Sequence, residues 1–470
     1  MSWTLVDGSF RDPSGFVYTR DGTLYRQVND RFREEFEAFL ASGLYDELAR
    51  DGLLVPHETA DPGLAATPDA FAVLRPRRVP FVSYPYEWCF SQLKDAALLT
   101  LDAQERALKH GFVLRDASAY NAQFLDGHPV LIDTLSFERH VEGRPWQAYR
   151  QFCEHFLVPL VLMSRIDVRC GSLLRDHLEG VPLELGSTLL PRRSWASFGL
   201  LLHVHMHARA KKKYEDAKVE TVARGRSISS GALSGLVGSL RAAVVRLDYE
   251  PSGTQWADYL TDHNYSEQAL RSKEGIVASF LDRLRPRTVW DAGANTGEYS
   301  RLAARDAEHV VSLDVDPAAV ERNYRRVRAD GEKRILPLLM DLTNPSPGQG
   351  WEHRERLSLE ARGPADALLA LALVHHLAIG HNVPLPRIAA YLARLCRALV
   401  IEFVPKSDSQ VARLLRSRAD IFPDYTPDGF ERAFAGSFEI RAREPVAESE
   451  RTLYLMVPRP GSNHEARVPV

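Results

Sequence analysis

The stretch DAGANTG, residues 291–297, has the residue types and spacing of a turn that binds a small ligand. It follows an apolar run and precedes a helix start, so its backbone N–H groups can bind an anionic group. The carboxylate of Asp291, beside the turn, can bind an ammonium group. A dinucleotide site would need Gly in place of Asn295, and Glu298 at the helix start repels phosphate. The stretch therefore favours a nucleotide-like ligand that has no pyrophosphate.

Two further acids end the next strand-like runs of the C-terminal half. Asp314 ends HVVSLD, and Asp341 ends RILPLLMD. A carboxylate at the second strand end can accept hydrogen bonds from both hydroxyls of a ribose, which predicts that role for Asp314. Asp316, two residues further on, is the alternative for this role. A lone acid at a strand end is commonly a helix cap, so only the regular series of acids indicates a ligand.

The pattern Asp291-x-Gly293-x-Asn295-x-Gly297 resembles the first motif of class I S-adenosylmethionine-dependent methyltransferases. The resemblance extends over about residues 256–460. It includes two terminal strand-like runs, which that family pairs as an antiparallel hairpin. It implies a Rossmann-like α/β methyltransferase sheet and S-adenosylmethionine as the cofactor.

The same resemblance assigns the remaining strand ends. In the family, the third strand end meets the adenine amino group, which implies that Asp341 contacts it and that Leu342 offers a backbone N–H. The fourth strand end forms the floor beside the methyl donor. The run ALALVHHL puts His375 and His376 at that position.

Methyl transfer is an in-line displacement in which the cofactor supplies the leaving group, so the protein mainly aligns the reacting atoms. A hydroxyl acceptor also needs a general base, and histidine titrates in a suitable range. His375 and His376 are the predicted bases, and Glu402 in VIEFV is the other candidate. Either histidine is alternatively a neutral core residue or a helix cap. Tyr265 and Lys273 either cover the cofactor or are a packed and a solvated side chain.

The sequence defines the methyl acceptor only in part. The fourth strand end lacks the Asn/Asp-Pro-Pro-aromatic signature that resembles methylation of amino groups, and no cysteine stands there for pyrimidine carbon chemistry. We therefore predict an oxygen acceptor on a small molecule or a carbohydrate, ahead of RNA. The net charge of −3 gives no reason to expect a nucleic-acid surface.

A second group of polar residues lies in the N-terminal half. It has the pattern Asp116-x4-Asn121, and Asp133 ends the following run PVLID. In phosphoryl transfer, one Asp orients the acceptor hydroxyl, while an Asn and a second Asp hold magnesium. This order and spacing resemble kinase-like phosphotransferases of the aminoglycoside-phosphotransferase type. The resemblance implies an α+β fold with a small lobe and a helical lobe, and it leaves ATP and Mg²⁺ open as ligands.

Two features depart from that phosphotransferase pattern. Arg26 is the residue nearest to the expected phosphate-binding Lys, and Arg cannot replace a compact ammonium without reshaping the site. No tight Gly-rich loop precedes it. Asp116 and Asn121 are alternatively turn residues of a helical domain, where both types are common. Three possibilities remain open: an inactive module that positions the substrate, a second active enzyme, and a non-catalytic interaction protein.

Alternating strand-like and helical runs must position the C-terminal residues. The expected strands are 288–293, 309–316, 334–341, 365–377, 397–404, 437–446 and 451–460, and the expected helices are 266–284, 298–307, 317–331 and 385–396. This alternation predicts a parallel sheet with helices on both faces. The N-terminal half is expected to contain an Asp-Gly hairpin (15–28), a helix (31–48), a strand, hinge and helix (80–111) and a buried helix (146–163).

Composition divides the chain at a stretch rich in Lys, Arg and small residues. It predicts a kinase-like domain over 1–215, a basic flexible linker over 216–255 and a methyltransferase domain over 256–462. The KKK run at 211–213 is alternatively a patch for an anionic substrate.

The four cysteines lie far apart and form neither a disulfide framework nor a zinc spacing. His203 and His207 share one face of a helix, but no acid or Cys is near them in sequence, so we predict a structural or interface role and no metal. The N-terminus has no basic and apolar leader, and no apolar run is long enough to span a bilayer. These features predict a cytoplasmic protein.

Overall fold

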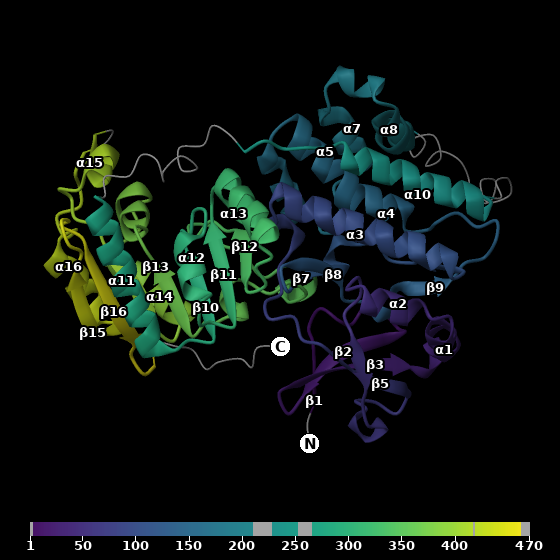
Figure 1. Ribbon diagram of the computed structural model, residues 1–470, viewed down its shortest axis with the longest axis horizontal. Helices are drawn as coiled ribbons and strands as arrows, with labels where there is room; N and C mark the ends of the chain where they lie inside the picture. Colours follow the sequence, from purple (N-terminus) through teal and green to yellow (C-terminus); the bar gives the residue numbers. More distant parts are fainter. Residues whose placement is uncertain (1–2, 210–227, 252–265, 417–418, 462–470) are drawn as a thin grey trace. The chain divides into compact units, whose positions relative to one another are not determined.

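The computed structural model describes residues 3–209, 228–251, 266–416 and 419–461. The chain divides into two compact units (Figure 1). Unit 1 comprises Met1–Glu250 with Gly350–Arg356, and unit 2 comprises Pro251–Gln349 with Leu357–Pro469. The basic run at 211–213 and Tyr265 lie outside the described residues.

Unit 1 begins with a five-stranded antiparallel sheet in the order β1-β2-β3-β5-β4. Its strands are β1 Trp3–Leu5, β2 Gly15–Arg20, β3 Thr23–Asn29, β4 His57–Thr59 and β5 Ala70–Pro76. The predicted hairpin over 15–28 is confirmed as β2 and β3. Its turn residues Asp21 and Gly22 have φ of 50° and 76°, the left-handed pair that a tight two-residue hairpin loop requires.

The single helix predicted over 31–48 is wrong, because two helices form there. α1 spans Arg33–Ala41 and α2 spans Leu44–Arg50. Gly43 between them has φ 78°, a left-handed value that ends a helix and that glycine adopts without steric cost.

The strand expected at the start of 80–111 lies earlier in the chain, as β5. Pro85–Glu87 instead form a 3₁₀ turn that leads into α3, Phe90–Lys109. Pro80 and Pro85 lack the N–H that a strand ladder needs, which explains the difference. The long helix itself is confirmed.

The rest of unit 1 is mainly helical. Two short antiparallel pairs interrupt it: β6 Phe112–Leu114 with β9 Phe137–Arg139, and β7 Ala122–Leu125 with β8 His128–Leu131. Its helices are α4 Tyr149–Phe152, α5 Val158–Arg165, α6 Leu173–Asp176, α7 Leu183–Leu189, α8 Phe198–Leu200 and α10 Ser230–Val245. A π-helical turn, Cys153–Leu157, joins α4 to α5, so the predicted helix over 146–163 is confirmed with one irregular turn.

The flexible linker predicted over 216–255 is wrong for much of the part that the structure describes. Residues 230–245 form α10, which packs on α3. Its buried face carries apolar residues at helical spacing: Leu233, Val237, Leu240 and Val244. The small residues of this stretch suggested flexibility, but one apolar stripe is enough to hold a helix on its neighbour.

Unit 2 contains a seven-stranded sheet in the order β12-β11-β10-β13-β14-β16-β15. Strands β10 to β14 are parallel, and β16 pairs antiparallel with both β14 and β15. The strands are β10 Thr288–Ala292, β11 His309–Asp314, β12 Ile335–Leu339, β13 Ala367–Ala370, β14 Leu399–Phe403, β15 Phe438–Pro445 and β16 Thr452–Pro458. The predicted parallel sheet with a terminal antiparallel hairpin is therefore confirmed.

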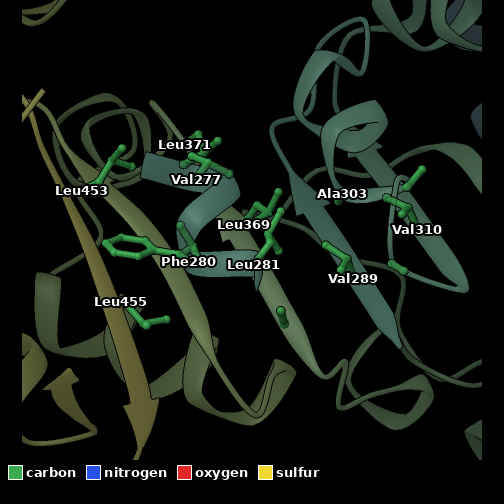
Figure 2. Packing of buried hydrophobic residues seen from close by; sticks show 14 of the residues in the cluster. Val277, Phe280, Leu281, Val289, Ala303, Val310, Leu369, Leu371, Leu453 and Leu455 are labelled. Atoms are coloured by element: carbon green, nitrogen blue, oxygen red, sulfur yellow. The ribbon is translucent and has the colours of Figure 1, made fainter. Parts of the chain in front are cut away.

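Helices connect these strands and cover the sheet. They are α11 Glu267–Leu284, α12 Glu298–Ala303, α13 Pro317–Asp330, α14 Leu385–Leu395, α15 Ser409–Leu415 and α16 Pro427–Ala435. Figure 2 shows how α11 contributes to the core, with Val277 and Phe280 in one buried cluster with Leu369 of β13 and Leu455 of β16. Burial of such side chains is the main stabilisation of the sheet, at about 25 cal/mol per Å² of apolar surface.

None of the helices in the described ranges combines the length and the apolar character that a bilayer crossing requires.

Candidate functional site

The turn after β10 has three residues in the left-handed region. Gly293, Asn295 and Gly297 have φ of 75°, 51° and 83°. Asn is one of the few side chains that tolerate this region, so the departure from Gly at 295 leaves the turn intact. At position 297 a Cβ would lie 2.5 Å from Asn323 Nδ2, so only glycine fits there. The turn is fixed to the next strand by Gly293 N–H, which donates to Leu313 O at 2.9 Å.

Asp314 ends β11 directly beside this turn. Its carboxylate accepts Asn295 N–H at 2.7 Å and Asp316 N–H at 2.9 Å. Burial raises the pKa of Asp314 to about 6. Asp316 has a different task, because it caps α13 by accepting Ala318 N–H at 2.8 Å. Of the two acids predicted for one role, Asp314 is therefore the one that lies on the turn.

Asp291, the acid at the start of the motif, is buried within β10. Its Oδ2 accepts Ser300 Oγ–H at 2.7 Å, and Ser300 in turn lies 3.0 Å from Ser312 Oγ. Burial raises the pKa of Asp291 to about 6, and Asp314 raises it further. Two neighbouring carboxylates thus have raised pKa values.

Asp341 and Leu342 follow β12, the third strand, and both are partly exposed. Asp341 Oδ1 accepts Thr343 N–H at 2.8 Å and Thr343 Oγ1–H at 2.6 Å, which is a local turn contact. The order of β12, β11 and β10 in the sheet brings Asp341, Asp314 and Asp291 to the carboxyl ends of three adjacent strands. In an open α/β sheet, that edge is where ligands bind.

The two predicted histidines follow β13 and stack on each other with ring centroids 4.1 Å apart. His375 is 1% exposed, and its Nδ1 has no hydrogen-bond partner among the described residues. Burial, with His376 and nearby cations, keeps the pKa of His375 well below its usual value. Burial also lowers the pKa of His376, to about 4. Both imidazoles are therefore neutral at pH 7.

Glu402, the third predicted base, is fully buried at the end of β14. Its Oε2 accepts Lys273 Nζ–H at 2.7 Å and Ala372 N–H at 2.8 Å, and Arg451 Nη1 lies 3.6 Å from its Oε1. Lys273 is therefore not the solvated residue of the alternative prediction. Burial lowers the pKa of Lys273, and the ion pair with Glu402 opposes this shift. No sequence pattern pointed to Arg451, which only the final strand brings to Glu402.

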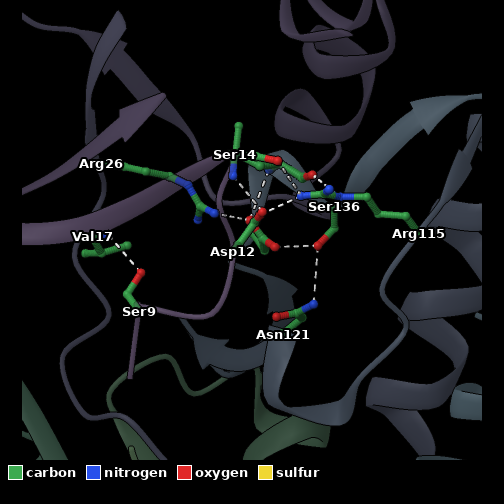
Figure 3. A network of polar contacts seen from close by, with 10 residues as sticks. Ser9, Asp12, Ser14, Val17, Arg26, Arg115, Asn121 and Ser136 are labelled. Carbon is green, nitrogen blue, oxygen red and sulfur yellow. Dashed lines mark hydrogen bonds and ion pairs between the residues drawn. The ribbon is translucent and has the colours of Figure 1, made fainter. Parts of the chain in front are cut away.

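In unit 1, the structure brings together all four residues of the phosphotransferase-like prediction, because Asn121 and Asp133 both act on Asp116. Figure 3 shows part of this cluster, with Arg26, Ser136 and Asn121. Arg26 Nη2 bonds to Asp133 Oδ1, which also accepts Leu135 N–H at 3.0 Å. Ser136 Oγ–H donates to Asp133 Oδ2 at 2.5 Å and accepts Asn121 Nδ2–H at 3.3 Å.

The two acids of this cluster have opposite pKa shifts. Burial raises the pKa of Asp116, whose Oδ1 accepts Ser118 N–H at 2.8 Å. Burial would raise the pKa of Asp133, but the charge of Arg26 and the hydrogen bonds from Ser136 and Leu135 together hold that pKa below its ordinary value. Asp133 therefore already has a counter-charge within the protein.

The histidine pair considered for a metal has internal partners. His203 Nδ1 lies 2.8 Å from Tyr149 Oη and its Nε2 lies 2.9 Å from Ser239 Oγ. His207 stacks on the Tyr149 ring with centroids 5.0 Å apart. No group of three or more His, Cys, Asp or Glu within the described ranges could hold a metal ion.

Similar solved structures match parts of the chain. Magnesium protoporphyrin IX methyltransferase from Synechocystis PCC 6803, with bound SAH, matches with a TM-score of 0.30 and 16% identity, over 41% of this chain and 84% of that one. WbdD with the kinase inhibitor LY294002 matches with a TM-score of 0.30 and 15% identity, over 43% of each chain.

No protein-family model matches the sequence. The chain is 37% identical over 455 residues to nodulation protein NoeA of Rhizobium meliloti (strain 1021). That alignment covers 96% of this chain and 95% of the relative. Identity at this level over nearly the whole length of both chains means that the protein belongs to the family of nodulation protein NoeA.

Proposed function

We propose that the protein is an S-adenosylmethionine-dependent methyltransferase. The observation that carries the proposal is the set of Asp291, Asp314 and Asp341 at the ends of three adjacent parallel strands, around the left-handed turn 293–297. The edge offers carboxylates for an ammonium and for ribose hydroxyls, and backbone N–H groups for a carboxylate. A sulfonium cofactor with an amino acid and a nucleoside has these polar groups.

Each residue of the cofactor set has a distinct proposed task. Asp291 supplies negative charge for the amino-acid ammonium, and Asp314 accepts the ribose hydroxyls. Asp341 and the Leu342 N–H contact the adenine. Burial raises the pKa values of Asp291 and Asp314 to about 6, and the charge of Lys273 offsets this only in part at Asp291. The cofactor's positive charge would favour their ionised forms.

The proposed acceptor is a hydroxyl of a small molecule or carbohydrate, with RNA as a less favoured substrate. Such an acceptor needs a base that is neutral before reaction. His375 meets this condition, because it is neutral and its Nδ1 makes no hydrogen bond within the described ranges. His376 is the alternative base.

Calorimetric titration of the full chain with S-adenosylhomocysteine (SAH) tests this function. We expect one site per chain and competition by S-adenosylmethionine. NAD is the control ligand, and we expect no binding because Glu298 opposes a pyrophosphate. Absence of SAH binding by the folded protein would remove the proposal and favour a non-catalytic interaction protein.

A second candidate function is phosphotransfer in unit 1, which would make the protein bifunctional. The observation in its favour is the convergence of Asn121, Asp133 and Arg26 on one hydrogen-bonded cluster. Against it, Arg26 already neutralises the acid that would hold Mg²⁺. Thermal stabilisation by ATP with Mg²⁺, but not by either alone, would favour bifunctionality. Its absence would leave unit 1 as a kinase-like module that positions the acceptor.

A further inference from the structure

A buried charged group in unit 2 has no task in the proposed cofactor site. It consists of Lys273 on α11, Glu402 at the end of β14 and Arg451 before β16, with side chains that are 5%, 0% and 3% exposed. Arg451 Nε also donates to Asp408 Oδ2 at 2.8 Å. Two positive and two negative side chains therefore balance one another away from water.

Such a group is costly to bury, because desolvation of the charges can exceed their mutual attraction. Hydrophobic residues of similar volume would fill this space as well. A role beyond packing is therefore expected for at least one member. Glu402 is the member that accepts a backbone N–H close to His375.

Glu402 accepts a backbone N–H from a residue in a disfavoured conformation. Ala372 follows β13 and has φ 50°, in the left-handed region that residues with a Cβ avoid. Its N–H donates to Glu402 Oε2 at 2.8 Å. Disfavoured backbone angles persist only where surrounding contacts hold them. Three residues later, His375 lies in the short helical segment that follows this turn.

We propose that Glu402 is a positioning residue that holds the turn 371–375 through Ala372 N–H and thereby fixes His375 beside the methyl donor. Lys273 and Arg451 place positive charge beside the two oxygens of the Glu402 carboxylate. This inference rests on the proposed methyltransferase function. It assigns Glu402 to alignment and leaves proton transfer to His375.

The geometry separates this role from that of a general base. A base needs a lone pair that is available to the acceptor hydroxyl, but Glu402 Oε2 already accepts two donors and its Oε1 lies 3.6 Å from Arg451 Nη1. A purely structural ion pair needs no bond to Ala372. The bond between Glu402 and Ala372 is therefore the contact that a test must remove.

Two double variants isolate that contact. The glutamine double variant combines Lys273→Met with Glu402→Gln, and the methionine double variant combines Lys273→Met with Glu402→Met. Both remove the ion pair with side chains of similar size, but only glutamine keeps an oxygen that can accept Ala372 N–H. We expect amide hydrogen exchange over residues 371–377 to be at least tenfold faster in the methionine double variant, with equal exchange in β10 and β11. Equal exchange over 371–377 in the two variants would overturn the proposal.

A chemical probe reports on His375 directly. Diethylpyrocarbonate modifies accessible neutral imidazoles, and His375 is buried in the resting protein. We expect modification of His375 to be faster in the methionine double variant than in the glutamine double variant, while modification of the buried His203 in unit 1 stays the same. Acceleration at both histidines would mean general loosening and would contradict a specific positioning role.

Glu402→Asp covers the case in which the methionine double variant does not fold. Asp keeps the charge but withdraws the carboxylate by one methylene, so the bond to Ala372 is expected to break while Lys273 stays paired. Exchange over 371–377 should again rise, and an unchanged rate would overturn the proposal. The exposed Glu444→Gln on β15 is the control. These measurements need no cofactor. If the wild-type protein does not bind SAH, the proposed function is contradicted independently of the result for Glu402.

Discussion

The two polar clusters of this protein differ in how their buried carboxylates are neutralised. In unit 1, Arg26 lies on Asp133 and holds its pKa below the ordinary value. In the described part of unit 2, no cation lies directly on Asp291 or Asp314, and burial raises both pKa values to about 6. The first acid has its counter-charge beside it, and the other two do not. The direction of a pKa shift thus distinguishes an internally satisfied cluster from one suited to a cationic ligand.

Asp314→Ala should have the largest effect on the unit 2 side of this comparison. SAH affinity is expected to fall roughly 100-fold, because hydrogen bonds to a charged group contribute about 1.5–3 kcal/mol each. Calorimetric titration measures the change. The exposed Asp282→Ala on α11 is the control and should bind as wild type does. Undiminished affinity in Asp314→Ala would remove this residue from the cofactor site.

Arg26→Met tests whether Arg26 neutralises Asp133 in unit 1. It leaves Asp133 without its cation, and breaking a buried pair in this way costs about 3–5 kcal/mol of unfolding free energy. The side chains of this pair are 11% and 18% exposed, so solvent screens it little. Arg75→Met, which breaks the exposed pair with Glu58 on the same unit, should leave the free energy of unfolding nearly unchanged. Denaturant unfolding compares the two, and equal losses would contradict the internal neutralisation of Asp133.

The pH dependence of SAH binding should differ from that of an ordinary carboxylate site. Because Asp291 and Asp314 have pKa values raised to about 6, both are mostly protonated at pH 5 and mostly ionised at pH 7. The ammonium of SAH favours the ionised acids, so its affinity is expected to rise with pH by about tenfold per coupled group over this range. Affinity that is flat between pH 5 and 7 would show that neither acid contacts the ligand.

Asp316→Ala should have the smallest effect and separates the two neighbouring acids. The variant loses the N-cap of α13, which typically costs about 1 kcal/mol of stability. SAH affinity should stay unchanged, because the cap faces Ala318 and not the turn. Thermal unfolding and titration of the same sample measure both quantities. A large loss of affinity would make Asp316 the ribose ligand instead of Asp314.

The local sequence predicted the secondary structure correctly where a single pattern was present. The alternation of strands and helices predicted the parallel sheet, and the final two runs predicted the antiparallel hairpin. The spacing of Gly293, Asn295 and Gly297 predicted a tight turn, and all three are left-handed. The assignment of ligands to this turn remains a prediction, as does the cytoplasmic location.

Local sequence failed where two patterns competed. Around 230–245, small residues suggested a linker, yet an apolar stripe packs α10 onto α3. Over 31–48, helical periodicity continued through Gly43, whose left-handed backbone divides the helix. In both places the less prominent sequence feature, the apolar stripe or the single glycine, agrees with the structure.

By itself, the sequence determined most ends of the parallel strands, because the period of apolar residues sets strand and helix. The strand expected over 365–377 was wrong at its end, because β13 stops at Ala370 and His375 lies in a helical segment. Only the tertiary structure decided the protonation and the tasks of those residues. Glu402 looked like a possible base until the fold set Lys273 and Arg451 against it, and Asp133 gained its partner Arg26 from a distant strand. Charge interactions depend on distance and burial, and neither is encoded in separation along the chain.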